Sequence, residues 1–400
     1  MKKKFLLVLL AAATAIGLLA GCGTKTESQN AQKQAALPEK EETKKAADET
    51  KDEPKNEQEE ESSAWIGVIL NGDETESYTL AHIEGIKKAA EAAQIPVEDI
   101  IWKERINAKD GCRNTVKELV NSGCRLIVSN SGVYENAMKE AAEKYPEVDF
   151  VAVGGEQAAG SGLPNFYDAR TCAYEADYVA GVAAGMKLRQ LDKEQKLPEK
   201  SKDRQDNVKL GYVAAEANCR VRAGINAYFN GVQSVYPDVV MQVEYTGAWS
   251  DSDAEATAAG DLIRAGCVIL AGNTDLDTMM QIAESANESG KCVYAVGRNI
   301  NVRKTAKQAA LLSVVSDWSV YYTQLFEAEL NGTSISKNWV GGYEKNAVRV
   351  TAPGKNAAPG TVKKIRKLQN QIRSGKKEVT SFSVRTLDGI TEVEKNKTDK

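Results

Sequence analysis

Four short polar loops contain the residues best suited to bind a ligand, and each loop follows a run of apolar residues typical of a strand. The loops span residues 71–79, 129–132, 246–251 and 271–274 and are rich in Gly, Ser, Thr and Asn. Such residues offer hydrogen bonds and close backbone approach without strong acid–base chemistry. In parallel α/β sheets, the carboxyl ends of strands face the amino ends of helices, where polar solutes gather. The pattern therefore predicts a binding site for a small solute.

Residues typical of an enzyme are scarce in this chain. His82 is the only histidine, and its position inside a predicted helix suits packing better than catalysis. Neither a G-x-S-x-G nucleophile elbow nor a G-x-x-x-x-G-K-[ST] phosphate loop occurs. Acid pairs such as Asp251 with Asp253, and Asp275 with Asp277, leave an exported hydrolase as a weaker alternative, although acids at helix starts usually act as caps. We expect no enzyme activity, no cofactor and no metal, since clusters at metal-ligand spacing are absent.

Strand-like runs and amphipathic helices alternate from residue 64 onward, which is the pattern of a parallel sheet covered on both faces. Strands are expected at 64–70, 100–102, 126–130, 150–153, 208–213, 241–245, 267–271 and 292–296. Helices are expected between them, and two more near 319–330 and 359–373. The alternation restarts at Val208 after a polar stretch. The sequence thus predicts two similar α/β lobes in tandem, with the chain recrossing between them near its end.

The predicted lobes are discontinuous in sequence. We expect the first lobe to comprise residues 64–170 plus about 300–330, and the second to comprise residues 171–299 plus about 331–385. Residues 386–400 are expected to form a flexible tail. Six cysteines within these ranges are scattered without a C-x-x-C pair, so most are interpreted as small buried hydrophobes, with any pairing left open.

The first 22 residues have the form of a bacterial lipoprotein signal. Three lysines precede an apolar run from Phe5 to Leu19, and the segment ends in Leu-Ala-Gly-Cys at Cys22. The apolar run is too short for a confident membrane span, and its small terminal residues indicate cleavage. We expect Cys22 to be diacylated and to anchor a monomeric protein on the outer side of the membrane. A plain secretory signal is the alternative.

Residues 23–63 are expected to form a disordered tether. Leu37 is their only large aliphatic residue, and Lys, Glu, Asp, Gln and Ala dominate, so the segment cannot bury enough apolar surface to offset the entropy of ordering it. The formal net charge of −4 includes this acidic segment. We expect no concentrated basic stripe in the folded part, which argues against nucleic acid as a partner.

Five segments match the motifs of a known family in order and at similar intervals. They are Ser77-Tyr78-Thr79 with Glu84-Gly85-Ile86, Tyr145-Pro146-Glu147-Val148, the small-residue helix 178–186, the loop 245–251 and the loop 271–274. From Trp65 to about Gly354 the chain resembles the basic membrane protein family of substrate-binding lipoproteins, whose founding receptors take up purine nucleosides. The resemblance implies a two-lobed type I periplasmic-binding-protein fold with ABC permease subunits as partners.

The resemblance also implies which residues contact the ligand. Aromatic residues of the first and third loops sandwich a planar base in the family, and the matching residues are Tyr78 and Trp249; ring stacking favours flat ligands. The alternative for either ring is packing between the lobes. Further ligand contacts are expected from these residues: Asn71, Thr79, Asn130, Gly272, Asn273, Arg298 and Asn299.

Several family residues that hold the sugar are replaced in this chain. Thr75 and the run Gly297-Arg298-Asn299 stand where the family has Asp, and a family Lys falls near Ser316. A modified nucleoside, a free base or another flat polar solute therefore stays open as the ligand. Arg298 could clamp a carboxylate or phosphate, or pair with an acid of the protein. A ligand-sensing lipoprotein on the same fold is the alternative function.

Overall fold

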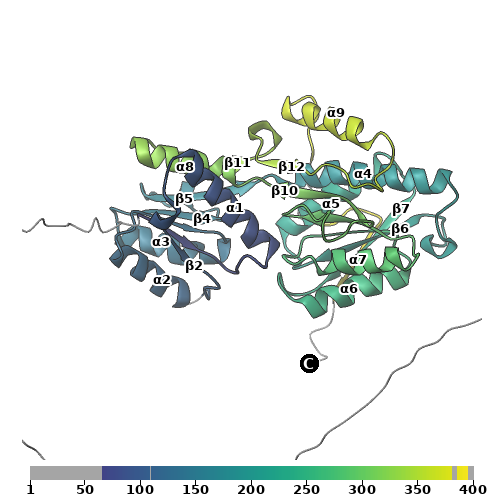
Figure 1. Cartoon of the computed structure of the whole chain (residues 1–400), viewed down its shortest axis with the longest axis horizontal. Coiled ribbons are helices and arrows are strands. Elements are labelled where there is room, and N and C mark those ends of the chain that lie inside the picture. The colour runs from purple at the N-terminus through teal and green to yellow at the C-terminus, as the bar shows by residue number, and fades with distance from the viewer. Residues whose placement is uncertain (1–64, 109, 381–384, 395–400) are drawn as a thin grey trace, which may run out of the picture. The chain divides into compact units, whose positions relative to one another are not determined.

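The computed structural model describes residues 65–108, 110–380 and 385–394 (Figure 1). The predicted signal peptide with Cys22 and the predicted tether lie outside these ranges. Among the described residues, no helix combines the length and the apolar character needed to cross a membrane.

The first lobe is built on a six-stranded sheet in which all neighbouring strands are parallel. The strand order is β11-β5-β4-β3-β1-β2. The strands are β1 (Ile66–Ile69), β2 (Ile100–Lys103), β3 (Leu126–Ser129), β4 (Asp149–Val153), β5 (Phe166–Thr171) and β11 (Asn338–Gly341). Residues of β1 and β3 are buried throughout, because helices cover both faces of the sheet.

Two pairs of helices cover this first sheet. Helices α1 (Ser77–Ala92) and α8 (Ser319–Asn331) share one apolar cluster with the sheet, and α2 (Asp110–Asn121) and α3 (Glu135–Lys144) share the cluster on the other face. Short 3-10 turns lie at Val97–Asp99, Gly132–Tyr134 and Ala158–Gly160. The sheet is thus held between two apolar layers, and the loops at its carboxyl edge are free to form a site.

The second lobe repeats this plan with a seven-stranded sheet in the order β12-β10-β9-β8-β6-β7-β13. Its neighbouring strands are parallel except for β12, which is antiparallel to β10. The strands are β6 (Val208–Ala214), β7 (Val239–Tyr245), β8 (Ile269–Gly272), β9 (Tyr294–Arg298), β10 (Ala310–Ser316), β12 (Val348–Val350) and β13 (Ile390–Glu394). The first five strands of each lobe share one order, second-first-third-fourth-fifth, which confirms the prediction of two similar halves.

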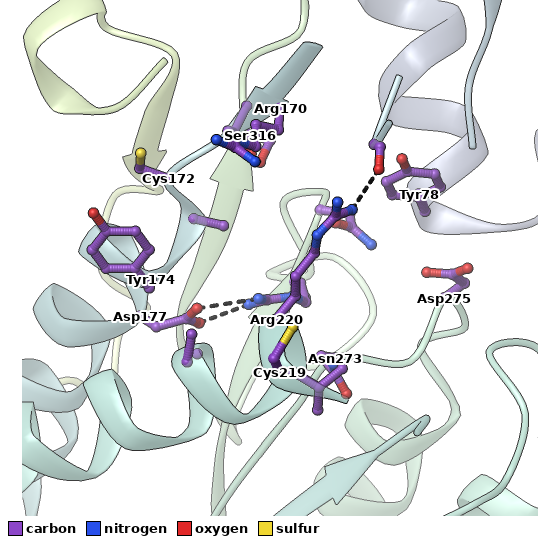
Figure 2. Close-up of a pocket in the computed structure, with 18 of the residues that line it drawn as sticks. Tyr78, Arg170, Cys172, Tyr174, Asp177, Cys219, Arg220, Asn273, Asp275 and Ser316 are labelled. Carbon is purple, nitrogen blue, oxygen red and sulfur yellow. Dashed lines mark hydrogen bonds and ion pairs between the residues drawn. The ribbon is translucent and has the colours of Figure 1, made fainter. Parts of the chain in front are cut away.

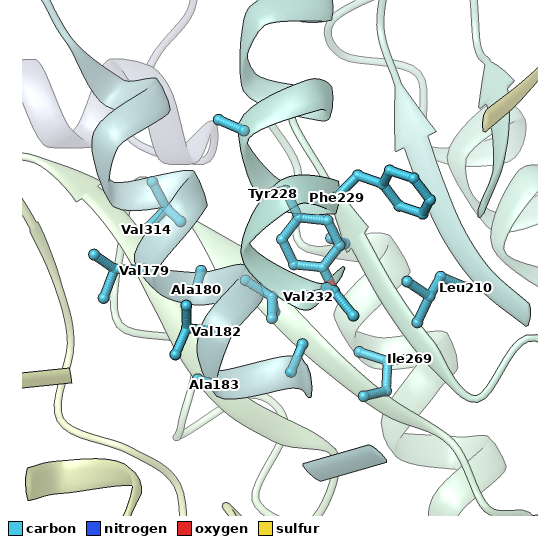
Figure 3. Packing of buried hydrophobic residues seen from close by; sticks show 14 of the residues in the cluster. Val179, Ala180, Val182, Ala183, Leu210, Tyr228, Phe229, Val232, Ile269 and Val314 are labelled. Atoms are coloured by element: carbon cyan, nitrogen blue, oxygen red, sulfur yellow. The ribbon is translucent and has the colours of Figure 1, made fainter. Parts of the chain in front are cut away.

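Helices α4 (Ala173–Lys193), α5 (Cys219–Gln233) and α9 (Thr361–Arg373) pack on one face of the second sheet, and α6 (Ser252–Ala265) and α7 (Thr278–Glu288) pack on the other. Helices α4 and α5 meet closely beside Tyr228 and Val232 (Figure 3). Gly181 and Gly231 make this approach possible, because a Cβ on either would overlap a carbonyl oxygen of the other helix. The remaining 3-10 turns are Glu199–Ser201 and Tyr343–Lys345.

The predicted lobe boundaries differ from the sheets in two places. Residues 310–316 form β10 in the second sheet, although residues 300–330 were expected in the first lobe. Residues 338–341 form β11 in the first sheet, although they were expected in the second lobe. The chain therefore passes between the lobes three times, after β5, after β10 and after β11. At the first two crossings, Thr171 Oγ1 and Ser316 Oγ lie 2.8 Å apart.

Two expectations about the carboxyl end need correction. The flexible tail expected from residue 386 is wrong for residues 390–394, because β13 pairs with β7 along its whole length and covers an edge strand that would otherwise be open. The expected lack of a basic stripe is wrong for α9. This helix buries an apolar face and exposes five cations, which no acid in the same helix balances: Lys363, Lys364, Arg366, Lys367 and Arg373.

Candidate functional site

A cavity of about 440 Å³ lies between the two lobes, at the carboxyl edges of both sheets (Figure 2). This volume is within the range of sites for small organic ligands, roughly 300 to 1,000 Å³. The first lobe contributes Tyr78, Arg170 and Trp318 to its wall, and the second contributes Asp177, Trp249 and Arg298. The wall is thus aromatic and charged, with residues drawn from both halves of the chain.

Asn130 and Asn273 occupy equivalent positions in the two lobes, directly after the third strand of each sheet. The strand order reverses there, between the first and third strands, and α/β sheets bind ligands at such a point. Asn130 Oδ1 accepts the backbone N–H of Asn71 at 3.0 Å, and Asn273 Oδ1 accepts that of Ala215 at 3.1 Å. Each side-chain oxygen therefore ties together the loops after the first and third strands. Only Asn273 also lines the cavity.

Tyr78 lies in the first turn of α1, where the loop after β1 ends. Its Oη donates to the carbonyl oxygen of Asn130 at 2.7 Å, and its ring meets the edge of His82 at 4.7 Å between centroids. His82 in turn stacks on Trp318 at 4.4 Å, and its Nδ1 lies 2.7 Å from Tyr322 Oη. Burial lowers the pKa of His82 to about 3, so the ring is neutral. His82 is therefore a packing residue behind two aromatic side chains of the cavity wall, as its sequence position predicted.

Trp249 lies in the loop between β7 and α6. Its side chain is 38% exposed and lines the cavity from the second lobe. The preceding Gly247 has φ +79, a conformation that favours glycine. Asp251 then caps α6 by accepting the N–H of Ala254 at 2.9 Å, which is the capping role expected of acids at helix starts. The loop thus presents a large ring on a fixed backbone.

Arg298 and Asp177 form a buried ion pair in the cavity wall. Arg298 donates two hydrogen bonds to the Asp177 carboxylate, at 2.7 and 3.1 Å (Figure 2), and the side chains are 18% and 4% exposed. Burial raises the pKa of Asp177 to about 6, although the charge of Arg298 opposes the shift. Of the two roles considered for Arg298, pairing with an acid of the protein is the one observed.

Asp275 is a second buried acid of the cavity wall and is 4% exposed. Its backbone joins the lobes, since its N–H donates to the Trp249 carbonyl at 2.8 Å and its own carbonyl accepts the N–H of Ser77 at 2.6 Å. Burial raises the pKa of its carboxyl to about 8, the charges of Glu76 and Glu255 add to the shift, and Arg298 opposes it. This carboxyl therefore ionises close to neutral pH.

A third acid of the wall, Glu156, is shared by two arginines. Arg220, in the first turn of α5, lies 2.7 Å from its carboxylate, and Arg170 lies 3.2 Å from it. Arg220 also donates to the Gly154 carbonyl at 2.6 Å (Figure 2). Its hydrogen bond to Glu156 lowers the pKa of that carboxyl. These side chains are about half exposed, so the pairs orient the loop and add little stability.

Five of the nine predicted ligand residues line the cavity: Tyr78, Trp249, Asn273, Arg298 and Asn299. Asn299 also donates to Ser77 Oγ at 3.0 Å across the lobes. The other four lie outside the cavity wall. Asn71, Thr79 and Asn130 form a polar network behind Tyr78, in which Thr79 is fully buried. Gly272 borders a separate, much smaller void beside Glu255.

Sequence reasoning missed several residues of the wall, and their positions explain why. Asp177 lies one turn inside α4, so it does not follow the predicted pattern of a loop after a strand. Trp318 does lie in such a loop, between β10 and α8, but no strand was predicted at residues 310–316. Arg220 follows Asn218, which caps α5 through the N–H groups of Arg220 and Val221. A helix-start motif was thus the only available signal for Arg220. Asp275 was interpreted as an ordinary cap.

Two similar α/β lobes around a ligand-sized cavity define a two-lobed solute-binding protein. The family model for ABC transporter substrate-binding proteins of the PnrA-like type matches residues 66–382, and the chain belongs to this family. This confirms the resemblance to basic membrane proteins. Members of the family are solute-binding proteins, which act outside the cytoplasm and present small molecules to transporter permeases.

Comparisons with individual proteins agree with this family. The chain is similar to a purine-binding protein of Brucella abortus, with 29% identity over 82% of this chain and 86% of that protein. It is 25% identical to a candidate ABC transporter glucose-binding protein of Haloferax volcanii, over 80% of this chain and 74% of that one. A solved ABC transporter solute-binding protein from Conexibacter woesei has a TM-score of 0.63 at 17% identity, covering 80% of this chain and 99% of that chain. This last likeness concerns the fold alone.

Proposed function

We propose that this chain is the lipid-anchored receptor of an ABC importer and that it binds a nucleoside-like or other flat, polar small molecule between its lobes. The observation that carries the proposal is the cavity wall itself. Tyr78 and Trp249 reach it from opposite lobes, and polar groups of Asn273 and Asn299 lie beside them. A flat ring can stack on aromatic side chains, which contributes about 0.5 to 1.5 kcal/mol beyond the burial of area.

The ligand class is supported by chemistry and by one relative. The cavity offers aromatic surface for a ring and amide side chains for its edge, and ligand sites typically combine apolar walls with a few polar groups. The relative from Brucella abortus is a purine-binding protein. The relative from Haloferax volcanii is a candidate glucose-binding protein, so a sugar is the ligand to exclude.

The proposed mechanism is closure of the lobes on the ligand. Backbone and side-chain hydrogen bonds already join the lobes beside the cavity, from Ser77 to Asp275 and from Asn299 to Ser77. A ligand that contacts both Tyr78 and Trp249 gains more in the closed form than in an open one, and only this difference in affinity can shift the equilibrium. The closed form is then the one that a permease recognises. Diacylation at Cys22 would keep the receptor next to that permease.

The proposal is tested by binding and turnover measurements on the mature chain. Adenosine, guanosine, inosine, the free bases and glucose are added separately, and melting temperature, calorimetric affinity and consumption of the compound are recorded. We expect at least one ring compound to raise the melting temperature of the protein without being consumed. Binding of glucose alone, or consumption of a compound, would refute it. Mass spectrometry of any co-purified molecule identifies the ligand directly.

A further inference from the structure

Asp275 differs from the other acids of the cavity wall, because its carboxylate has no partner among the residues that the structure describes. Three acidic side chains line the cavity among the described residues. Arg298 holds Asp177 through two hydrogen bonds, and Arg220 and Arg170 hold Glu156. No hydrogen bond or ion pair from the described residues reaches the Asp275 carboxylate, although the residue is only 4% exposed. Its oxygens keep some solvent access, and a ligand that covers them without supplying a donor would leave them unpaired.

The backbone of Asp275 is hydrogen-bonded to both segments that carry the aromatic side chains of the wall. Its N–H is bonded to the carbonyl of Trp249, and its carbonyl is bonded to Ser77, the neighbour of Tyr78. The charge of Asp275 also adds to burial in raising the pKa of Tyr78, which reflects their proximity, and Figure 2 shows the two side chains on the same side of the pocket. A ring held between Tyr78 and Trp249 would therefore turn an edge towards this carboxylate.

We propose that Asp275 is a specificity-determining residue, whose carboxylate accepts hydrogen bonds from N–H groups on the edge of a heteroaromatic ligand. This inference rests on the proposed function and names its substrate class: rings with an amino group on that edge, in preference to rings that lack it. Amide side chains alone would not discriminate in this way, because they offer a donor as well as an acceptor. The carboxylate does discriminate, because a ligand without the donor leaves the buried acid unpaired.

A buried hydrogen-bonding group of this kind can produce a large ratio of affinities between two ligands. Sites built to hydrogen-bond a ligand group reject the analogue that lacks it by about 10⁴-fold in favourable cases. The cavity is partly open and Trp249 is 38% exposed, so water can reach the site in part. We therefore expect a preference of about tenfold to a hundredfold.

Two pairs of nucleosides test the proposal, because each differs by one amino group. Adenosine is compared with purine riboside, and guanosine with inosine, by calorimetry on the mature chain. We expect the amino compound of at least one pair to bind at least tenfold more tightly. Asp275→Asn keeps the shape of the side chain but replaces one acceptor by a donor, and should reduce that preference below threefold. Asp253→Asn, an exposed site on α6, is the matched control and should leave it unchanged.

A measurement on the unmodified protein covers the case in which Asp275→Asn fails to fold. The charged groups facing Asp275 are Glu76 at the start of α1, Glu255 on α6 and Arg298 on β9. If the ionised carboxylate accepts from the ligand, binding of the amino compound releases a proton, and its affinity rises at least tenfold from pH 6 to pH 8. An affinity that falls over this range would mean that the carboxyl donates, and would overturn the proposal.

The outcomes separate this inference from the proposed function. If ring compounds bind but no amino preference exists, or if the preference survives in Asp275→Asn, the role of Asp275 is wrong and the receptor function stands. If no ring compound binds to the unmodified protein, the proposed function fails and the inference fails with it.

Discussion

The backbone N–H of Ser77 donates a 2.6 Å hydrogen bond to the carbonyl oxygen of Asp275, and this bond joins the two lobes. Ser77 precedes Tyr78 of the cavity wall, and Asp275 is itself part of that wall. The same turn of α1 therefore carries an aromatic residue of the cavity wall and a contact between lobes. In the proposed function, ligand binding and lobe closure would be coupled through these adjacent residues.

Trp249→Ala tests the aromatic contact from the second lobe. Loss of the stacked ring should weaken ligand binding at least tenfold, which corresponds to about 1.4 kcal/mol. The melting temperature should change little, because the side chain is 38% exposed. Leu330→Ala removes another exposed apolar side chain, at the end of α8, and should leave affinity unchanged. Equal affinities of Trp249→Ala and the unmodified protein in calorimetry would refute the assignment.

Asp177→Ala tests the buried ion pair. Removing the carboxylate leaves Arg298 as an uncompensated buried charge, and such losses cost about 3 kcal/mol. Urea unfolding should show a loss of this size in the free energy of unfolding. The double variant Asp177→Leu with Arg298→Met should recover most of it, because it removes both charges. A loss below about 0.5 kcal/mol in the single variant would show that the pair is solvated.

The neutral state of His82 can be followed directly, since the chain has one histidine. Burial lowers its folded pKa to about 3, against about 6.5 in an unfolded chain. The unfolded state therefore takes up a proton first, and stability is lost as pH falls from about 6.5 towards 3. In NMR spectra of an untagged protein, the ring signals should not shift between about pH 8 and about pH 5. A midpoint near 6.5 would contradict the buried position.

Gly181→Ala tests the close contact of α4 with α5. The new Cβ would overlap the Tyr228 carbonyl oxygen, so the helices must move apart, at a cost of about 1 to 3 kcal/mol. Gly160→Ala is the matched change, because a Cβ there meets nothing within 4 Å. Chemical unfolding should separate the two variants by at least about 1 kcal/mol. Equal stabilities would mean that the helices adjust freely.

The two-lobed fold was predictable because its signals are local. Buried parallel strands are apolar throughout, as in β1 and β3, and the restart at Val208 marks the second sheet. The sheet to which a late strand belongs is not a local property. Neither β10 nor β11 carries a residue that identifies its neighbours, and β13 gains its place from pairing with β7, which is distant in sequence.

The candidate site was predictable in part for a related reason. Loops after strands must gather at one edge of a sheet, and this placed Tyr78, Trp249 and Asn273 in the wall. The use of each side chain depends on neighbours that the sequence does not reveal. The amide oxygen of Asn130 accepts the backbone N–H of Asn71. Arg298 forms an ion pair with Asp177, which lies 121 residues earlier in the sequence. Asp275 looks like a helix cap from the sequence, and only the fold shows that it lines the cavity.

The three passages of the chain between the lobes limit how this protein can be dissected. The edge strand β11 of the first sheet is formed by residues 338–341, which follow strand β10 of the second sheet in the sequence. Any continuous fragment that contains all strands of the first sheet must also contain most of the second. Neither half can therefore be produced alone by simple truncation, and isolating one would require a circular permutation or a spliced gene.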